Sequence, residues 1–143
     1  MLVRLLYCSE MAEPRGSKLL EDIMAQSRRL NPERGVTGLL CVSDAQFIQV
    51  LEGGRAQVCA LYNAIVRDPR HTHVTLLSFE EITERTFGSW SMGQVELAKI
   101  NPGLLLKYFE HAKLAPTAAS GRATMALLEE LLASGAIVQR ADS

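Results

Sequence analysis

The sequence predicts a single α+β domain built on a mixed sheet, and three observations support this prediction. Five short apolar segments have the length of strands: 2–8, 36–42, 47–51, 74–79 and 90–97. Two segments between them, 17–30 and 58–66, repeat apolar residues with helical spacing. The chain has 143 residues, which fits one domain when domains average roughly 100–200 residues.

Composition and charge exclude several classes of protein. With 48% hydrophobic and 22% charged residues, the chain has the balance of a globular protein and not of a disordered one. Its 15 basic and 16 acidic residues leave a net charge of −1, so the concentrated basic surface of a nucleic-acid-binding module is not expected. No apolar run approaches the roughly 18 residues of a membrane span, and Arg4 interrupts the apolar N-terminus, which argues against a secretory signal.

The cysteines and histidines do not form a recognisable metal or disulfide pattern. Cys8, Cys41 and Cys59 are odd in number, widely spaced and set among apolar neighbours. His71 and His73 lie close together but have no cysteine or carboxylate pair nearby. We therefore expect no metal site, buried cysteines that act as small hydrophobes, and a reducing cytoplasmic location.

The first half of the chain predicts a strand, a helix and a hairpin. In the first strand, alternation puts Tyr7 on one face together with Val3 and Leu5. Ser17 is a candidate N-cap for the following helix, and Asn31-Pro32 is expected to end it, because a residue before proline avoids the helical region. Segments 36–42 and 47–51 are joined by four residues, so these two strands should be antiparallel.

The second half completes a βαββαββ order, a ferredoxin-like arrangement. Gly53-Gly54 should end the third strand, and a helix should follow up to Asp68-Pro69. Right-handed crossovers would place both helices on one face of the sheet. Beyond Asn101-Pro102, two short amphipathic helices are expected near 104–109 and 125–132, covering the other face or forming a surface for self-association.

Gln49 is a polar residue in a segment that otherwise has the pattern of a buried strand. Alternation puts it on the face of Phe47 and Leu51, which is the face that the two helices should cover. A buried amide left without partners costs roughly 1–3 kcal/mol. Taken alone, it is best interpreted as an amide bonded to neighbouring backbone.

Other polar and aromatic residues converge on the same face. Ile23, Ser27 and Asn31 fall at i, i+4 and i+8 and form one line along the first helix. Trp90 and Met92 should share a face of the last strand. Each is ordinarily a core or capping residue, and Arg70-His71 would ordinarily be solvated. Together with Tyr7 and Gln49 they describe a pocket suited to a planar heterocycle.

Five motifs resemble the signatures of the BLUF family, the blue-light sensors that use flavin adenine dinucleotide. They occur in order and at the expected spacing: Leu6-Tyr7-Cys8-Ser9, 35–40 (GVTGLL), 47–53 (FIQVLEG), 68–71 (DPRH), and 85–87 (RTF) continuing to 90–92 (WSM). The resemblance extends from about Leu2 to about Leu97. It implies a photosensor domain over 1–97 and a C-terminal helical extension over 98–143.

The resemblance also assigns roles to individual residues. Tyr7 resembles the photoactive electron donor of the family, and Gln49 resembles the glutamine that bridges this tyrosine and the flavin. Trp90 and Met92 resemble the pair that reports the state of the glutamine to the rest of the protein. The residues that would contact the flavin are Tyr7, Ile23, Ser27, Asn31, Leu40, Phe47, Gln49, Asp68, Arg70 and His71.

The function implied is that of a photoreceptor, not an enzyme, with non-covalently bound FAD. Because the extension is too short to hold an output enzyme, the resemblance implies signalling through a separate partner, such as an EAL-type cyclic-di-GMP phosphodiesterase or a transcriptional regulator. A homodimer or higher homo-oligomer is expected from the surplus apolar surface of the extension. The alternative is a ferredoxin-like small-molecule binding or regulatory module that uses the same pocket without photochemistry.

Overall fold

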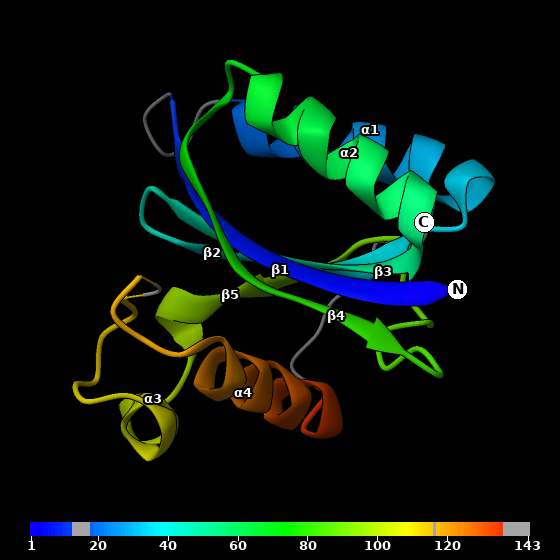
Figure 1. The fold of residues 1–143 in the computed structure, drawn as a ribbon. Coiled ribbons are helices and arrows are strands. Elements are labelled where there is room, and N and C mark those ends of the chain that lie inside the picture. The colour runs from blue at the N-terminus through cyan, green and yellow to red at the C-terminus, as the bar shows by residue number, and fades with distance from the viewer. Residues whose placement is uncertain (13–17, 116, 136–143) are drawn as a thin grey trace.

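A five-stranded sheet lies between two layers of helix (Figure 1). The computed structural model describes residues 1–12, 18–115 and 117–135. The elements are β1 (Leu2–Met11), α1 (Leu19–Arg34), β2 (Thr37–Ser43), β3 (Gln46–Gly54), α2 (Arg55–Arg67), β4 (His71–Ile82), β5 (Gly93–Glu96), a 3-10 turn (Leu97–Lys99), α3 (Pro102–Tyr108) and α4 (Gly121–Ala133). The predicted α+β class and the βαββαββ order are confirmed.

The sheet is mixed, with strand order β4-β1-β3-β2-β5. β1 pairs antiparallel with both β3 and β4, and β2 and β3 form the predicted antiparallel hairpin. Only β5 runs parallel to its neighbour, β2. Both α1 and α2 cover one face of this sheet, as right-handed crossovers require (Figure 1). We call this face the front face and the opposite one the back face.

The front face carries the first hydrophobic cluster. Tyr7 of β1 lies directly opposite Gln49 of β3, and the pairs on either side of them alternate between the two faces. Buried residues from the sheet and the two helices form this cluster: Val3, Leu5, Tyr7, Leu19, Ile23, Met24, Val36, Leu40, Val42, Phe47, Leu51, Val58 and Met92. α2 contributes one buried residue, Val58, and its partly buried Leu61, Tyr62 and Ile65 also pack against the cluster.

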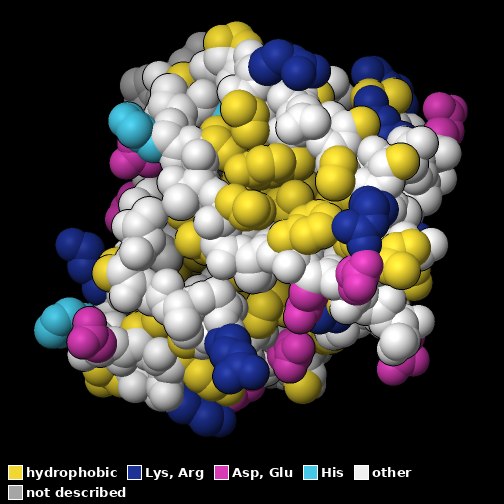
Figure 2. Space-filling model, viewed as in Figure 1, with side chains coloured by type: hydrophobic (Ala, Val, Ile, Leu, Met, Phe, Trp, Pro, Cys, Tyr) yellow, Lys and Arg dark blue, Asp and Glu magenta, His cyan; other side chains and the backbone are white. Residues whose placement is uncertain are grey.

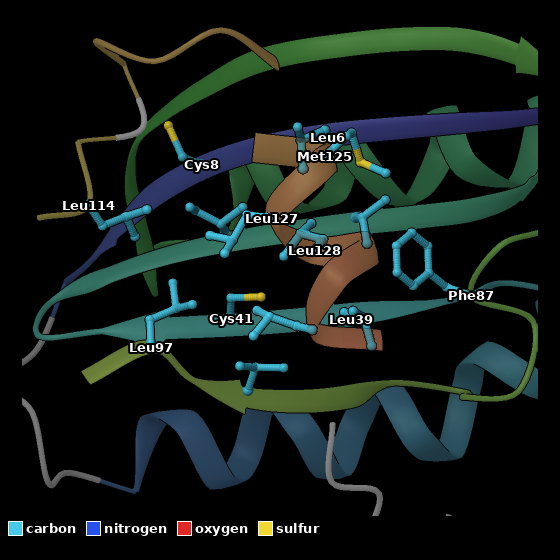
Figure 3. Close-up of a cluster of buried hydrophobic side chains, with 14 of the residues drawn as sticks. Leu6, Cys8, Leu39, Cys41, Phe87, Leu97, Leu114, Met125, Leu127 and Leu128 are labelled. Atoms are coloured by element: carbon cyan, nitrogen blue, oxygen red, sulfur yellow. The ribbon is translucent and has the colours of Figure 1, made fainter. Parts of the chain in front are cut away.

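The back face carries a second cluster that α4 covers. Leu6, Ile48 and Val50 of the sheet belong to one cluster with Leu127 and other residues of α4. Figure 3 shows Leu6, Leu127 and Leu128 in this cluster. The prediction that the C-terminal helices cover this face is confirmed. Leu2 of β1, which strand alternation assigns to the same face as Leu6, is half-buried and lies outside the cluster.

The predicted end of the first helix is wrong. α1 continues through Pro32 to Arg34, and Gly35 caps it in the left-handed region at φ 68°. The local cost of a proline is outweighed because Asn31 is held by tertiary bonds, and its backbone oxygen accepts from the Val36 amide at 3.0 Å. The predicted N-cap, Ser17, lies outside the described residues.

Several predicted strands have different lengths in the structure. β4 covers His71–Ile82 and not 74–79, because an edge strand with polar, exposed side chains lacks an apolar pattern to mark its ends. β5 covers only Gly93–Glu96, so Trp90 and Met92 precede the strand. β1 also extends further than predicted, to Met11.

One part of the surface is markedly apolar. Figure 2 has the same view as Figure 1, and it shows a contiguous hydrophobic area at the position of α2 and β4. Val66 is 50% exposed, Leu76 49% and Phe79 38%. Soluble monomers rarely leave large apolar patches uncovered, so this area is a candidate contact surface.

Candidate functional site

A cleft between α1 and α2 opens above the front face of the sheet. It encloses about 100 Å³ and is lined by Ile23, Gln26, Ser27, Asn31, Arg34, Gln49, Leu61, Ala64, Ile65, Asp68, Arg70 and His71. The structure thus brings together seven of the predicted contact residues. Tyr7, Leu40 and Phe47 lie beneath them in the front cluster.

The floor of the cleft is formed by a buried tyrosine–glutamine pair. Tyr7 is fully buried and Gln49 is 4% exposed. The Tyr7 hydroxyl donates a hydrogen bond to Gln49 Oε1. Burial raises the pKa of the Tyr7 phenol well above its usual range, and nearby Tyr62 and Asp68 act in the same direction. The phenol therefore keeps its proton at physiological pH in the resting protein.

The other end of the Gln49 amide contacts Met92. Gln49 Nε2 donates to Met92 Sδ at 3.2 Å, and a thioether sulfur is a weak acceptor. The partners of this amide are thus two side chains, not the neighbouring backbone that a lone buried glutamine would lead one to expect. Because its donor and acceptor ends differ, rotating the amide would exchange what faces Tyr7 and Met92.

Asn31 links the cleft to the segment that precedes β5. It is 1% exposed, and its Nδ2 donates to the Ser91 carbonyl at 2.9 Å. With Ile23 and Ser27 it lines the cleft from one stripe of α1, which confirms the predicted alignment of these three residues.

Asp68 and Arg70 form an ion pair at the cleft. Arg70 donates to the Asp68 carboxylate at 2.6–3.1 Å and to Gln26 Oε1 of α1 at 2.7 Å. The hydrogen bonds from Arg70 hold the pKa of Asp68 below its ordinary value. These bonds connect the segment after α2 to α1. Gln26 was not identified from the sequence as a residue of the cleft.

His71 is buried against the floor of the cleft, so it is not solvated as an isolated Arg-His pair would be. Its Nδ1 lies 3.0 Å from Ser9 Oγ, and its ring centroid is 5.4 Å from that of Phe47. Burial lowers the pKa of His71, Asp68 opposes this shift, and Arg70 adds to it. The role of Ser9 was also missed, because only the pairing of β1 and β4 brings it to His71.

The predicted arrangement of Trp90 and Met92 is wrong. Met92 belongs to the front cluster, whereas Trp90 packs against the back cluster. The chain bends at Ser91 and Met92 before β5 begins, so the alternation of a strand does not apply there. The two side chains therefore lie on opposite faces of the sheet.

The polar groups of the cleft are of the kind that binds a planar heterocycle. The amides of Asn31 and Gln49 and the guanidinium of Arg70 offer hydrogen-bond donors and acceptors beside apolar lining residues such as Ile23 and Leu61. A site for a planar heterocycle combines polar and apolar groups in this way. Sites for ligands of this size usually enclose about 300–1,000 Å³. This cleft encloses about 100 Å³ in the structure, which is less than that range.

Comparison with known proteins identifies the family. The model of the family BLUF, sensors of blue-light using FAD, matches residues 2–93. The chain therefore belongs to the BLUF family. The blue light- and temperature-regulated antirepressor BluF of Escherichia coli is 34% identical over 97 residues, which cover 68% of this chain and 24% of that protein. Photoactivated adenylate cyclase subunit beta of Euglena gracilis is 36% identical over 92 residues, covering 64% of this chain and 11% of that protein.

Solved structures of similar size agree with this assignment. BlsA in its photo-activated state has a TM-score of 0.81 at 31% identity, with 92% of this chain and 95% of that chain covered. BlrB in its dark state has a TM-score of 0.74 at 29% identity, with 94% and 96% covered. By contrast, this chain spans a quarter or less of the two curated relatives named above.

Within residues 1–12, 18–115 and 117–135, no cluster of three or more His, Cys, Asp or Glu side chains could hold a metal ion. In the same part of the chain, no helix is long and apolar enough to cross a membrane.

Asn31→Ala should reduce flavin occupancy. The substitution removes an amide from the cleft and also frees the Ser91 carbonyl, so both the ring edge and the adjoining segment lose a partner. The ratio of flavin to protein absorbance, measured after purification in excess FAD, gives the occupancy. Asn63→Ala is the matched control, because Asn63 is exposed on α2. Equal occupancy in the two variants would show that Asn31 does not contact the flavin.

His71 should make the stability of the flavin-free protein depend on pH. The pKa of His71 is lower in the folded protein than the value near 6.5 expected in the unfolded chain. The unfolded chain therefore binds this proton more readily, and the stabilising contribution of neutral His71 is lost as the pH falls below about 6.5. We expect the Tm to fall between about pH 7.5 and about pH 5.5, and to fall less in His71→Gln. The exposed His111→Gln should keep the full slope; an unchanged slope in His71→Gln would contradict the prediction.

Proposed function

We propose that this chain is a blue-light photoreceptor that binds FAD without a covalent bond in the cleft between α1 and α2. The observation that carries the proposal is the buried chain of contacts from Tyr7 through Gln49 to Met92. These contacts join the phenol of Tyr7, which keeps its proton, to the amide of Gln49, which can rotate. Both groups lie at the floor of the cleft, and other polar side chains line it. Membership of the BLUF family supports the same reading.

In this mechanism Tyr7 and Gln49 perform the switching. A bound oxidised flavin supplies the absorption of blue light and an excited state that accepts an electron. Tyr7 would give an electron and then its hydroxyl proton to the bound flavin, and it would regain both from the flavin when the charge separation ends. While the phenolic hydrogen bond is broken, the Gln49 amide rotates or tautomerises, so that a different end of it faces Tyr7 and Met92. The resting arrangement returns thermally.

Illumination of the purified protein tests the proposal. The protein should be yellow after incubation with FAD, show a small red shift of its absorbance in blue light, and recover in the dark. Parallel incubation with FMN shows whether the adenylate half is needed. A preparation that stays colourless with both flavins would favour the alternative, a small-molecule binding module without photochemistry.

Gln49→Leu should keep the flavin and abolish the red shift. Leucine fills the buried position but has no amide to rotate, and it leaves the Tyr7 hydroxyl without its partner. Absorbance spectra before and after illumination give the result. Gln57→Leu is the control, because Gln57 is exposed on α2. A normal shift in Gln49→Leu would rule out the amide as the switch.

The output of the receptor is proposed to pass to a separate protein. We infer a photosensor over 1–97 and a helical extension over 98–143 that carries the signal, with no catalytic activity of its own. A cyclic-di-GMP phosphodiesterase of the EAL type and a transcriptional regulator are the candidate partners. Relatives named as an antirepressor and as cyclase subunits support an output of this regulatory kind.

We also propose that the chain self-associates, as a homodimer or a higher homo-oligomer, in the cytoplasm. The exposed side chains of Val66, Leu76 and Phe79 support this proposal, because they provide an apolar contact surface on α2 and β4. Light scattering of the full chain over a concentration series measures the mass of the assembly. A mass equal to that of a single chain at all concentrations would contradict it.

A further inference from the structure

A second buried polar cluster lies on the back face, outside the flavin cleft. Glu52, near the end of β3, is fully buried although it carries a carboxylate. Its Oε2 accepts from Arg4 Nε at 2.8 Å, and β1 and β3 place these two residues directly opposite each other. Arg4 also pairs with Glu80 at 2.8 Å, so the cluster joins three adjacent strands.

The same carboxylate holds the segment that leads to β5. We call residues 84–92 the switch loop. Glu52 Oε1 accepts from the Phe87 amide at 2.6 Å, and Oε2 accepts from the Thr86 amide at 3.1 Å. Arg85 adds bonds from its side chain to the carbonyls of Gly35 and Glu52 at 2.7 and 3.2 Å. Hydrogen bonds to an ionised acceptor are about twice as strong as neutral ones, so this end of the loop is firmly fixed.

The other end of the switch loop belongs to the flavin cleft. The Ser91 carbonyl accepts from Asn31, and Met92 Sδ accepts from Gln49 at 3.2 Å. The Gly38 amide of β2 donates to the Trp90 carbonyl at 3.1 Å. Rotation of the Gln49 amide would remove the donor that faces Met92, so this end is the one that the switch can release.

Between its two ends the loop reaches the cluster under α4. Phe87 is fully buried, and Figure 3 shows its ring directed into the back cluster, to which Leu128 of α4 also belongs. Trp90 packs against the same cluster. The switch loop therefore has contacts on both faces of the sheet, with Met92 in the front cluster and with Phe87 and Trp90 at the back cluster, to which α4 belongs.

We propose that Glu52 is a positioning residue that fixes one end of the switch loop, and that Phe87 is the contact through which movement at Met92 reaches α4. A loop that is free at both ends would absorb a displacement by sliding. With the Thr86 and Phe87 amides fixed to a buried carboxylate, a displacement at Met92 is transmitted to the residues between, where Phe87 and Trp90 contact the back cluster. This inference rests on the proposed function, since the displacement starts at Gln49.

Glu52→Gln tests the positioning role. Glutamine has the same shape, but its NH₂ group cannot accept a bond from a backbone amide, so one loop contact is replaced by two facing donors. Trp90 is the only tryptophan in the sequence, and its fluorescence reports on the loop. We expect Glu52→Gln to keep the red shift of the flavin and to lose most of the light-induced change in Trp90 fluorescence. Glu80→Gln is the control, because Glu80 is the exposed partner of the same arginine.

Phe87→Leu tests the contact with α4 independently, and it also decides the matter if Glu52→Gln does not fold. Amide hydrogen exchange of α4 is compared between light and dark in the full chain with flavin bound. We expect Phe87→Leu to keep the red shift and lose most of the light-induced difference in α4. Phe79→Leu, at a half-exposed phenylalanine of β4, should keep that difference. A purely structural role would change exchange equally in light and dark.

The outcomes separate this inference from the proposed function. If the unmodified protein shows no red shift, the proposed function fails. If the unmodified protein instead shows a red shift but no light-induced change in Trp90 fluorescence or in the hydrogen exchange of α4, the role of the switch loop is overturned. The same conclusion follows when Glu52→Gln and Phe87→Leu show the same light-induced changes as the unmodified protein. In both cases the photoreceptor assignment stands.

Discussion

Tyr7→Phe should retain the flavin but lose the long-lived red-shifted state. Phenylalanine keeps the ring within the front cluster, where Tyr7 is fully buried, so the cleft should keep its shape. The substitution removes the hydroxyl that donates to Gln49 and, with it, the proton that must leave when the side chain is oxidised. Without this proton transfer the hydrogen bonds of the Gln49 amide do not change, so the amide should not rotate. The absorbance spectrum after blue light should then equal the spectrum before it.

Tyr62→Phe provides the matched control for this experiment. Tyr62 lies close to Tyr7, with ring centroids 5.6 Å apart, but it has no hydrogen bond to Gln49 in the structure. Both variants lose one phenol near the cleft, and only one of them should lose the red shift. If Tyr62→Phe were inactive and Tyr7→Phe normal, the electron donor would have been assigned to the wrong tyrosine.

The sequence predicted the central pair of the site because strand alternation is a local property. Tyr7 and Gln49 were each placed on the helix-covered face from their own segments, and the pairing of β1 with β3 then sets them opposite each other. The line of Ile23, Ser27 and Asn31 was predicted for a similar reason, since helical spacing fixes which side chains share a stripe.

The features that the sequence did not predict depend on tertiary contacts. α1 continues past Pro32 because bonds to residues outside the helix hold Asn31. Trp90 and Met92 diverge because the chain bends before β5 begins, which a short apolar run does not reveal. Glu52 carried a usable signal, as a charged residue at a position that alternation assigns to the back face. Its partner Arg4 is 48 residues away, however, and only the register of β1 and β3 identifies it.

Removal of the C-terminal extension should reduce solubility but leave the photochemistry intact. Truncation after Leu97 deletes α3 and α4, and it exposes the back-face residues of β1, β2 and β3 that α4 now covers, among them Leu6, Leu39 and Val50. A contiguous apolar area of this kind is rarely left bare by a soluble monomer. The residues of the flavin cleft all precede the cut, so flavin binding and the red shift should largely persist while the protein aggregates and loses control of its partner.

Point substitutions in α4 should show that this effect comes from burial and not from chain length. Leu128→Ala, at a side chain 1% exposed and packed in the back cluster, should lower the free energy of unfolding by about 2–5 kcal/mol. Leu106→Ala removes the same atoms from a side chain of α3 that is 56% exposed, and it should change stability by no more than about 0.5 kcal/mol. Urea unfolding gives both values, and light scattering of the truncated chain gives its state of aggregation. A truncated protein that stays soluble, together with equal stability of the two leucine variants, would show that α4 does not act as the cover of the back face.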